Sequence, residues 1–477
     1  MARKKYQLVI IGGGVGGLVA ASGAAQLGAK VALVEKARLG GDCLHYGCVP
    51  TKSLVRSAHV AHLCKNAALF GMKMKNFEVD FHKVQERRLK VQHHLEEHDD
   101  PKRFEEMGVD LYFGEGTFLD ANRFEVDDTI LQAQHFLIAT GTRPAVPPIA
   151  GIETSAYLTN ETILGLIDLP KRLTILGGGP IGIEYAQLMQ RMGSQVSVLE
   201  MGDRILPRDD EGLTRRLSHM LSAEGVCIHT GVEVNKVERK RSGVTVTAAS
   251  AKGEVVLESD QLLVSAGRLP NLAGLGLEKI GVETSKRGIK VNDMLQTSVP
   301  HIYAVGDVTG TYAFTHMAEY QAGIALSNIL YPIRRHADYS AVPWVTYTDP
   351  ELASVGMGQV EAREKFGASA IEVLRFPVEE IDRSLIDGYQ KGLAKIICTK
   401  RGRIIGASIL AHRAGDLLPA FCLAIRKKMK VQDLAQTVLP YPTAGQIVWR
   451  TSQQWYRKKL FDGWFGKASK WWLKFKR

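Results

Sequence analysis

Cysteine is scarce in this chain, with only six among 477 residues. So few cysteines exclude a disulfide scaffold of the kind found in small secreted proteins. Four of them, at positions 64, 227, 398 and 422, are scattered and are expected to be ordinary core or surface thiols. Cys43 and Cys48 lie five positions apart, and in a reducing compartment such a pair is more often catalytic or metal-binding than structural.

An export signal and a membrane span are also missing. The start MARKKYQ passes directly into the strand-like LVII without a cleavage site, so we expect a cytoplasmic protein. Residues 6–29 carry no charge over 24 positions, which is long enough to imitate a membrane span. Seven of those positions are glycine, and their spacing is that of a phosphate-binding turn, so we expect no span there.

Positive charge is unevenly distributed along the chain. Of the formal net charge of +11, residues 450–477 supply +8, from nine lysines and arginines and one aspartate. The remaining 449 residues carry only +3. The basic balance therefore belongs to the tail, and we expect no nucleic-acid partner for the rest of the chain. The length predicts about three domains.

Two glycine-rich turns have the pattern of dinucleotide-binding sites. The first has G-x-G-x-x-G at Gly12, Gly14 and Gly17 between a strand and a helix, with Glu35 eighteen residues later. The second repeats it at Gly177, Gly179 and Gly182, with Glu200 at the same spacing. In this pattern the glycines admit a pyrophosphate at the helix N-terminus and the acid binds a ribose. Two such units predict two dinucleotides and electron transfer between them.

Glu200 bears on the choice of nicotinamide. A carboxylate at this position favours the free 2′-hydroxyl of NADH and repels a 2′-phosphate, although Arg204 nearby softens the preference. We therefore expect NADH, with NADPH possible. Three further apolar strands end in glycine turns, at 136–144, 262–271 and 301–310. In the last of these, Asp307 is placed to hold a ribityl hydroxyl of a flavin.

The cysteine pair lies in GGDCLHYGCVPTK, where Gly47 to Pro50 reads as a helix start. The positive end of the helix dipole favours the Cys48 thiolate, and Lys52, one turn later, adds positive charge. Cys43 is close enough to form a small reducible disulfide with Cys48. Zinc is disfavoured, because His45 supplies only a third ligand.

In the order of these motifs, residues 5–449 resemble the FAD-dependent pyridine nucleotide–disulfide oxidoreductases, which include dihydrolipoamide dehydrogenase, glutathione reductase and mercuric reductase. The resemblance implies an α/β fold with two Rossmann-like dinucleotide-binding domains and a C-terminal α+β dimerisation domain. FAD would be bound by residues 1–150 and 271–340, NAD(P)H by 151–270, and a homodimer formed by 341–449, followed by a basic tail at 450–477.

The same resemblance implies site residues. Cys48 would contact the flavin, Cys43 would attack the substrate, and Lys52 and Glu184 would pair beside the flavin. The FAD-binding residues would be Gly12, Gly14, Gly17, Glu35, Lys36, Gly41, Asp42, Lys52, Thr140, Gly141, Gly306 and Asp307. The NAD(P)H-binding residues would be Gly177, Gly179, Gly182, Glu200 and Gly267. No resident metal is expected.

One departure from the family limits the function. Most members have His-Pro-Thr-x-x-Glu near the C-terminus, reaching into the partner's site, whereas this chain has Tyr441 and Gln446 in the equivalent places. Tyrosine, with an ordinary pKa of about 10 against about 6.5 for histidine, is a poor base at neutral pH. Rapid dithiol–disulfide exchange is therefore disfavoured. A tyrosine at this position resembles the mercuric reductases. Those enzymes also have a C-terminal cysteine pair that passes metal to the site, whereas this chain has no cysteine after Cys422.

The tail combines aromatic and basic residues. Five of the six tryptophans lie in the last 29 residues. Phe461, Trp464, Phe465, Ala468, Trp472 and Phe475 fall at helical spacing, and Lys467, Lys470 and Lys474 share another face. A basic amphipathic helix with tryptophan on its apolar side suits a membrane interface. Packing on the homodimer is an alternative, and contact with a protein partner or a nucleic acid is a further one.

The prediction is an FAD enzyme that passes electrons from NADH to a Cys43–Cys48 disulfide and on to a small-molecule or protein disulfide or a thiol-bound metal ion. One alternative is a carrier at the inner face of the membrane that reduces a quinone or membrane protein. The further alternative is a dihydrolipoamide dehydrogenase. In all three cases Tyr441 would take the place of the usual histidine.

Overall fold

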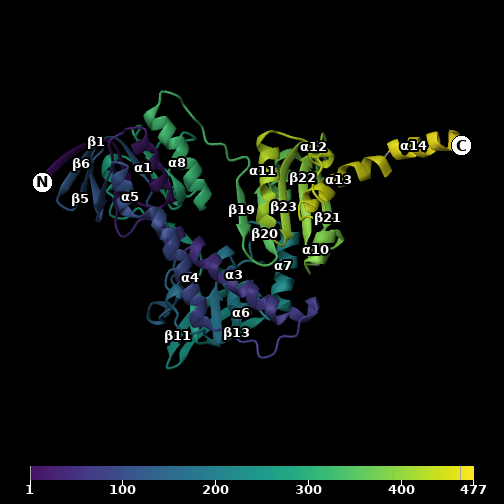
Figure 1. Ribbon diagram of the computed structural model, residues 1–477. Coiled ribbons are helices and arrows are strands. Elements are labelled where there is room, and N and C mark those ends of the chain that lie inside the picture. The colour runs from purple at the N-terminus through teal and green to yellow at the C-terminus, as the bar shows by residue number, and fades with distance from the viewer. Residues whose placement is uncertain (1, 390, 462–463, 477) are drawn as a thin grey trace.

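The computed structural model describes residues 2–389, 391–461 and 464–476. Three packed bodies follow from the elements described below, and a C-terminal helix extends away from them (Figure 1). The N-terminus lies on the first body, at the opposite side of the molecule from that helix.

The first body contains a seven-stranded sheet in the order β3–β2–β1–β6–β5–β4, with β18 also paired to β6. The strands are β1 (Ala2–Ile11), β2 (Val31–Glu35), β3 (Val109–Phe113), β4 (Gly116–Asp120), β5 (Arg123–Val126), β6 (Thr129–Ile138) and β18 (Ile302–Ala304). β1 runs parallel to β2 and β6. Its fully buried run from Leu8 to Ile10 is typical of a central parallel strand. Helices α1 (Val15–Gln26) and α8 (Thr315–Leu330) pack together on this sheet, so residues far apart in sequence share one body.

The second body repeats this plan on a smaller scale. A parallel sheet has the order β10–β9–β8–β14, formed by β8 (Arg172–Leu176), β9 (Gln195–Glu200), β10 (Cys227–Thr230) and β14 (Gln261–Val264). Helices α6 (Pro180–Met192) and α7 (Glu211–Ala223) lie between its strands in the sequence. An antiparallel layer of β11 (Val232–Lys240), β12 (Gly243–Ser250) and β13 (Gly253–Ser259) packs beside it. Strands β7 (Thr142–Pro144) and β15 (Arg268–Pro270) pair where the chain enters and leaves this body.

The third body is an antiparallel sheet in the order β19–β20–β23–β22–β21. Its strands are β19 (Pro343–Thr346), β20 (Glu351–Gly356), β21 (Ile371–Pro377), β22 (Leu393–Thr399) and β23 (Ile404–Ala411). The helices around it are α9 (Gln359–Phe366), α10 (Asp382–Ile386), α11 (Leu418–Arg426), α12 (Val431–Gln436) and α13 (Gln446–Phe461). Ile396, Ile409, Phe421 and Trp455 are buried in one core, so α11 and α13 close the sheet.

The long helix α3 (Cys48–Lys65) connects the first body to the second. α2 (Gly41–His45) and α3 (Cys48–Lys65) follow β2, and α4 (Phe81–Glu96) and α5 (Pro101–Glu106) lead back to β3. Leu54 and Ala58 of α3 share an apolar cluster with Ile183 and Leu188 of α6. α3 thereby fastens the first body to the second.

The C-terminal tail divides into two parts. Trp455 on α13 is only 2% exposed and belongs to the core of the third body, whereas α14 (Trp464–Phe475) projects outward (Figure 1). Among the described residues, no helix is both long and apolar enough to cross a membrane.

Candidate active site

One continuous cleft of about 2210 Å³ is lined by residues of the first and second bodies. It is lined by both glycine turns, through Gly12 and Gly14 and through Gly177 and Gly179, and by Cys43 and Cys48. Two predicted nucleotide sites and the predicted thiol pair therefore share one continuous space. This continuity is what electron transfer from one dinucleotide to a sulfur pair requires.

The first glycine turn fits a pyrophosphate. Gly12 has φ +110°, and a Cβ there would overlap the carbonyl oxygen of Ala139, while a Cβ at Gly17 would overlap the carbonyl of Gly12. α1 begins with Gly14 as its N-cap and no side chain caps it, so its first N–H groups are available to an anion. The Glu35 carboxylate accepts hydrogen bonds from the Gly13 N–H at 2.7 Å and the Ala37 N–H at 2.9 Å.

The second turn has the same geometry. Gly177 also has φ +110°, and a Cβ at Gly182 would overlap the carbonyl oxygen of Gly177. α6 starts after Gly179 without a side-chain cap, and a Cβ at Gly179 would meet no protein atom within 4 Å. The space in front of this turn is therefore left for a ligand. Glu200 accepts hydrogen bonds from the Gly178 and Gly202 N–H groups, both at 2.6 Å.

Sequence patterns assigned each acid to a ribose, and the structure adds a second task. Glu35 and Glu200 each hold the backbone of the glycine turn that they face. The carboxylates therefore fix the backbone of both glycine turns.

The remaining predicted flavin residues lie along the same cleft. Lys36, Gly41, Asp42, Thr140, Gly141, Gly306 and Asp307 all line it, as does Gly267 on the nicotinamide side. Burial raises the pKa of Asp307, whose carboxylate accepts a hydrogen bond from Thr142 Oγ1 at 3.1 Å. Arg268, the first residue of β15, was not found from the sequence, because a single arginine has no distinguishing pattern. It pairs with Asp42 at 3.1 Å and donates to Thr142, and so holds two sides of the cleft together.

The cysteine pair lies at the junction of α2 and α3. Cys43 is on α2 and Cys48 is the first residue of α3, and both are free thiols in this structure. A hydrogen bond with Cys43, helped by the Lys52 charge, lowers the pKa of Cys48 to about 6. The same hydrogen bond, together with burial, raises the pKa of Cys43. The pair therefore holds one proton between two sulfurs near neutral pH, with Cys48 as the thiolate.

Thr315 and Tyr347 complete the surroundings of the pair and were missed from the sequence. Thr315 Oγ1, at the start of α8, lies 3.7 Å from Cys48 Sγ. The Lys52 ammonium forms an ion pair with Glu184 at 2.8 Å and lies 4.6 Å from the centre of the Tyr347 ring. The Tyr347 N–H donates to the other Glu184 oxygen at 2.9 Å. These residues lie far from Cys48 in the sequence, so no local motif identifies them.

The two charges of this ion pair should shift the Cys48 pKa in opposite directions. We expect Lys52→Met to raise it by about one unit, because a nearby cation stabilises the thiolate. Glu184→Gln should lower it, because a nearby anion destabilises the thiolate. The measurement is the pH dependence of Cys48 alkylation in the reduced holoenzyme, with the exposed Lys83→Met as control. Shifts of the same sign in both variants would contradict the assignment.

A buried cluster joins the three bodies behind the site. The Asp349 carboxylate accepts a hydrogen bond from Arg191 at 2.9 Å and contacts His59 Nδ1 at 3.0 Å and His412 Nδ1 at 3.4 Å. Burial alone would raise the pKa of Asp349, but hydrogen bonds with His412 and His59 and the Arg191 charge hold it well below its usual range. The cluster links α3, α6 and the β19–β20 connection.

Those three elements carry the groups around the thiols. α3 carries Cys48 and Lys52, α6 carries Glu184, and the β19–β20 connection carries Tyr347. The cluster therefore positions the ion pair from its far side. Polar residues of this kind, spread over the whole sequence, could not have been grouped without the fold.

Tyr441 and Gln446 lie away from this constellation in the single chain. Tyr441 is 69% exposed, and a hydrogen bond with Asp382 raises its pKa. Gln446 begins α13 and donates to the Pro440 carbonyl at 3.4 Å. Neither residue lines the cleft, whereas the other predicted catalytic residues Cys43, Cys48, Lys52 and Glu184 do.

Comparison with known proteins identifies the family. Residues 6–322 match the pyridine nucleotide-disulphide oxidoreductase model, and residues 342–451 match the dimerisation domain of that family. The chain belongs to the pyridine nucleotide–disulphide oxidoreductases. The predicted family and fold class are confirmed, as are the dependence on FAD and NAD(P)H and the presence of a homodimerisation domain.

Individual relatives represent more than one activity. The chain is 36% identical over 447 residues to a mercuric reductase of Lysinibacillus sphaericus, covering 92% of this chain and 81% of the relative. It is 37% identical over 453 residues to a dihydrolipoyl dehydrogenase of Bacillus subtilis, covering 93% and 95%. A solved Cu(II) complex of the HOCl-induced flavoprotein disulfide reductase RclA from Escherichia coli has a TM-score of 0.85 and 28% identity, covering 94% of this chain and 99% of that one. The chain is thus an NAD(P)H-dependent flavoprotein disulfide oxidoreductase, and the acceptor has to be argued from its site.

Proposed function

We propose that this enzyme uses NADH to reduce a soft metal ion that is bound by the sulfur atoms of Cys43 and Cys48. The observation that carries the proposal is the combination of a low-pKa thiolate with a missing acid–base pair. Cys48 has a pKa of about 6, while Tyr441 and Gln446 stand where most relatives have histidine and glutamate. Metal binding needs thiolates, whereas disulfide exchange also needs a proton donor.

The chain's own groups have separate tasks in this reaction. Bound FAD supplies a two-electron relay between the nicotinamide and the sulfur pair. The glycine turns and Glu35 and Glu200 hold the dinucleotides, and the Lys52–Glu184 pair holds positive charge near Cys48. One hydride from NADH carries two electrons, enough to reduce one mercuric ion to metal or two cupric ions to cuprous ions, with release of NAD⁺ and a proton.

The similarity to mercuric reductases and to RclA supports a metal acceptor. The described residues contain no cluster of three or more His, Cys, Asp and Glu side chains able to hold a metal, so we treat the metal as a substrate and not a resident ion. We further propose NADH as the donor, because Arg204 donates to the Pro207 carbonyl at 2.7 Å while Glu200 faces the cleft. Since the reaction needs reduced thiols, we place the enzyme in the cytoplasm.

The test compares acceptors for the purified holoenzyme. We expect NADH oxidation with Hg²⁺ or Cu²⁺, supplied as thiol complexes, to exceed that with lipoamide or glutathione disulfide by about 100-fold or more, because disulfides require the absent acid–base group. Activity with metal should fall as the pH drops through about 6, where the Cys48 thiolate is protonated. Reactions without enzyme control for direct reduction of metal by NADH. Lipoamide turnover at a rate equal to that with metal would reject the proposal.

A further inference from the structure

An aromatic surface on α14 is exposed to solvent. Trp471, Trp472 and Phe475 are 63%, 60% and 77% exposed, in contrast to Trp455 of the preceding helix, which is 2% exposed. The rings of Trp471 and Phe475 are in contact, with centroids 5.0 Å apart, so Trp471 joins the face predicted from the sequence. With Ala468 these residues occupy positions i, i+3, i+4 and i+7, which is one side of a helix. We call this set the aromatic face.

A basic strip runs beside the aromatic face. Lys467, Lys470 and Lys474 are all exposed and recur at spacings of three and four, so they lie on one side of α14. Among the described residues, no carboxylate forms an ion pair with any of the three. The segment 450–477 contributes +8 to the net charge, and no acid of α14 itself offsets this charge. The helix is therefore amphipathic and strongly cationic.

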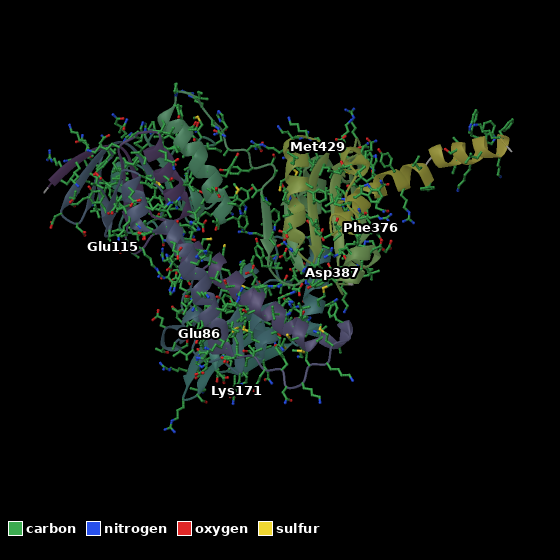
Figure 2. All side chains as sticks on the ribbon, viewed as in Figure 1. Glu86, Glu115, Lys171, Phe376, Asp387 and Met429 are labelled. Atoms are coloured by element: carbon green, nitrogen blue, oxygen red, sulfur yellow. The ribbon has the colours of Figure 1, made fainter. Side chains whose placement is uncertain are left out.

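Neither surface is covered by the body of the protein. α14 extends outward from the end of α13 (Figure 1). Its side chains project into open space around the helix (Figure 2). It also lies beyond residue 451, where the match to the dimerisation domain ends. The family's usual dimer contact therefore does not account for this helix.

We propose that α14 docks the enzyme on an anionic membrane surface, lying parallel to it with the aromatic face buried among the lipid headgroups. Tryptophan favours this interfacial depth, and neighbouring lysines reach anionic lipid phosphates. With 12 residues, α14 is about 18 Å long, which is too short to cross a bilayer core of about 30 Å. A contiguous aromatic face on a convex, isolated helix favours a lipid interface over a nucleic acid, which the lysines alone would fit equally well.

The experiment measures co-sedimentation of the full-length holoenzyme with vesicles. Vesicles containing phosphatidylglycerol should bind it, vesicles of pure phosphatidylcholine should bind it far less, and binding should weaken as salt is raised. Each lysine near the surface contributes about fivefold in affinity, so Lys467→Gln, Lys470→Gln and Lys474→Gln together should weaken binding by about 100-fold. A matched triple variant at the exposed Lys73, Lys75 and Lys252 should leave binding unchanged.

The aromatic face has its own matched control. Trp471→Ser with Phe475→Ser should weaken vesicle binding by about tenfold or more, because two buried apolar side chains are lost from the interface. Leu473→Ser removes an equally exposed apolar side chain, at 62%, from the opposite side of α14 and should have little effect. NADH oxidation in solution should be the same for all of these variants, which separates this proposal from the identity of the acceptor.

Four results would overturn the proposal. They are equal binding to anionic and neutral vesicles, an effect of Leu473→Ser as large as that of the aromatic variant, full competition by duplex DNA, and loss of the dimer when residues 464–477 are deleted. Loss of the dimer, measured by light scattering, would make α14 a structural contact between subunits. Retention of the dimer with loss of vesicle binding supports the membrane contact.

Discussion

Replacing Cys43 with serine is expected to stop acceptor reduction while NADH still reduces the bound flavin. Cys43 is the half-buried partner of the Cys48 thiolate. Its replacement removes one of the two sulfurs that, in our proposal, form a disulfide or hold a metal. Loss of a residue that bonds to the substrate commonly lowers turnover by several orders of magnitude, so we expect about 1,000-fold or more. The measurement is steady-state turnover combined with anaerobic titration by NADH.

The titration distinguishes a redox pair from two unrelated thiols. The oxidised native enzyme should take up two electrons at the flavin and two at the disulfide, whereas Cys43→Ser should take up only the first two. Cys227→Ser removes another exposed cysteine outside the cleft and serves as the control. Uptake by the native enzyme that matches the Cys43→Ser variant would show that no redox disulfide forms.

Restoring the missing acid–base pair is expected to produce the second large change. Tyr441→His combined with Gln446→Glu should raise lipoamide-dependent turnover by about 100- to 10,000-fold, the usual contribution of general acid–base catalysis. A histidine titrates near neutral pH, and a glutamate restored at position 446 is expected to stabilise its protonated form. The measurement is kcat/KM for lipoamide with NADH, in parallel with the metal assay.

The single variants provide the controls for this gain. Tyr441→His alone should recover less activity, since Gln446 carries no charge to stabilise an imidazolium. Tyr441→Phe should leave lipoamide turnover low, because the exposed phenol has a pKa raised by Asp382 and is already a poor acid at neutral pH. If the double variant shows no gain while its dimer is intact, the slow exchange of disulfides has a cause other than the missing pair.

Sequence patterns predicted the parts of the site that depend on local backbone geometry. A positive φ at Gly12 and Gly177 admits little but glycine, so both turns are visible in the sequence. The position of Cys48 at a helix start was also visible in the sequence, from the Gly47 to Pro50 pattern. Thr315, at the start of α8, and Tyr347, in the β19–β20 connection, lie hundreds of residues from the thiols in the sequence. Only the packing of the three bodies brings them to the site.

The tail shows the same limit. Both Trp455 and Trp471 lie at helical spacing in a basic segment, and composition alone cannot tell them apart. Trp455 is buried because α13 packs on the sheet of the third body, whereas Trp471 is exposed because α14 extends beyond that sheet. The structure therefore shows packing on protein for α13, whereas contact of α14 with a membrane is our proposal.

The hydrogen bonds from backbone N–H groups to Glu200 affect how coenzyme preference could be redesigned. An engineer seeking an NADPH-dependent variant would begin by removing this acid, since it repels a 2′-phosphate. Both of its carboxylate oxygens, however, accept backbone hydrogen bonds, from Gly178 and Gly202. A small neutral replacement would remove both hydrogen bonds from the glycine turn and its neighbour, and would weaken the binding of NADH and NADPH alike. Glutamine keeps an acceptor for one of the two amides, so it is the better starting point, with new positive charge added at the cleft wall near Arg208.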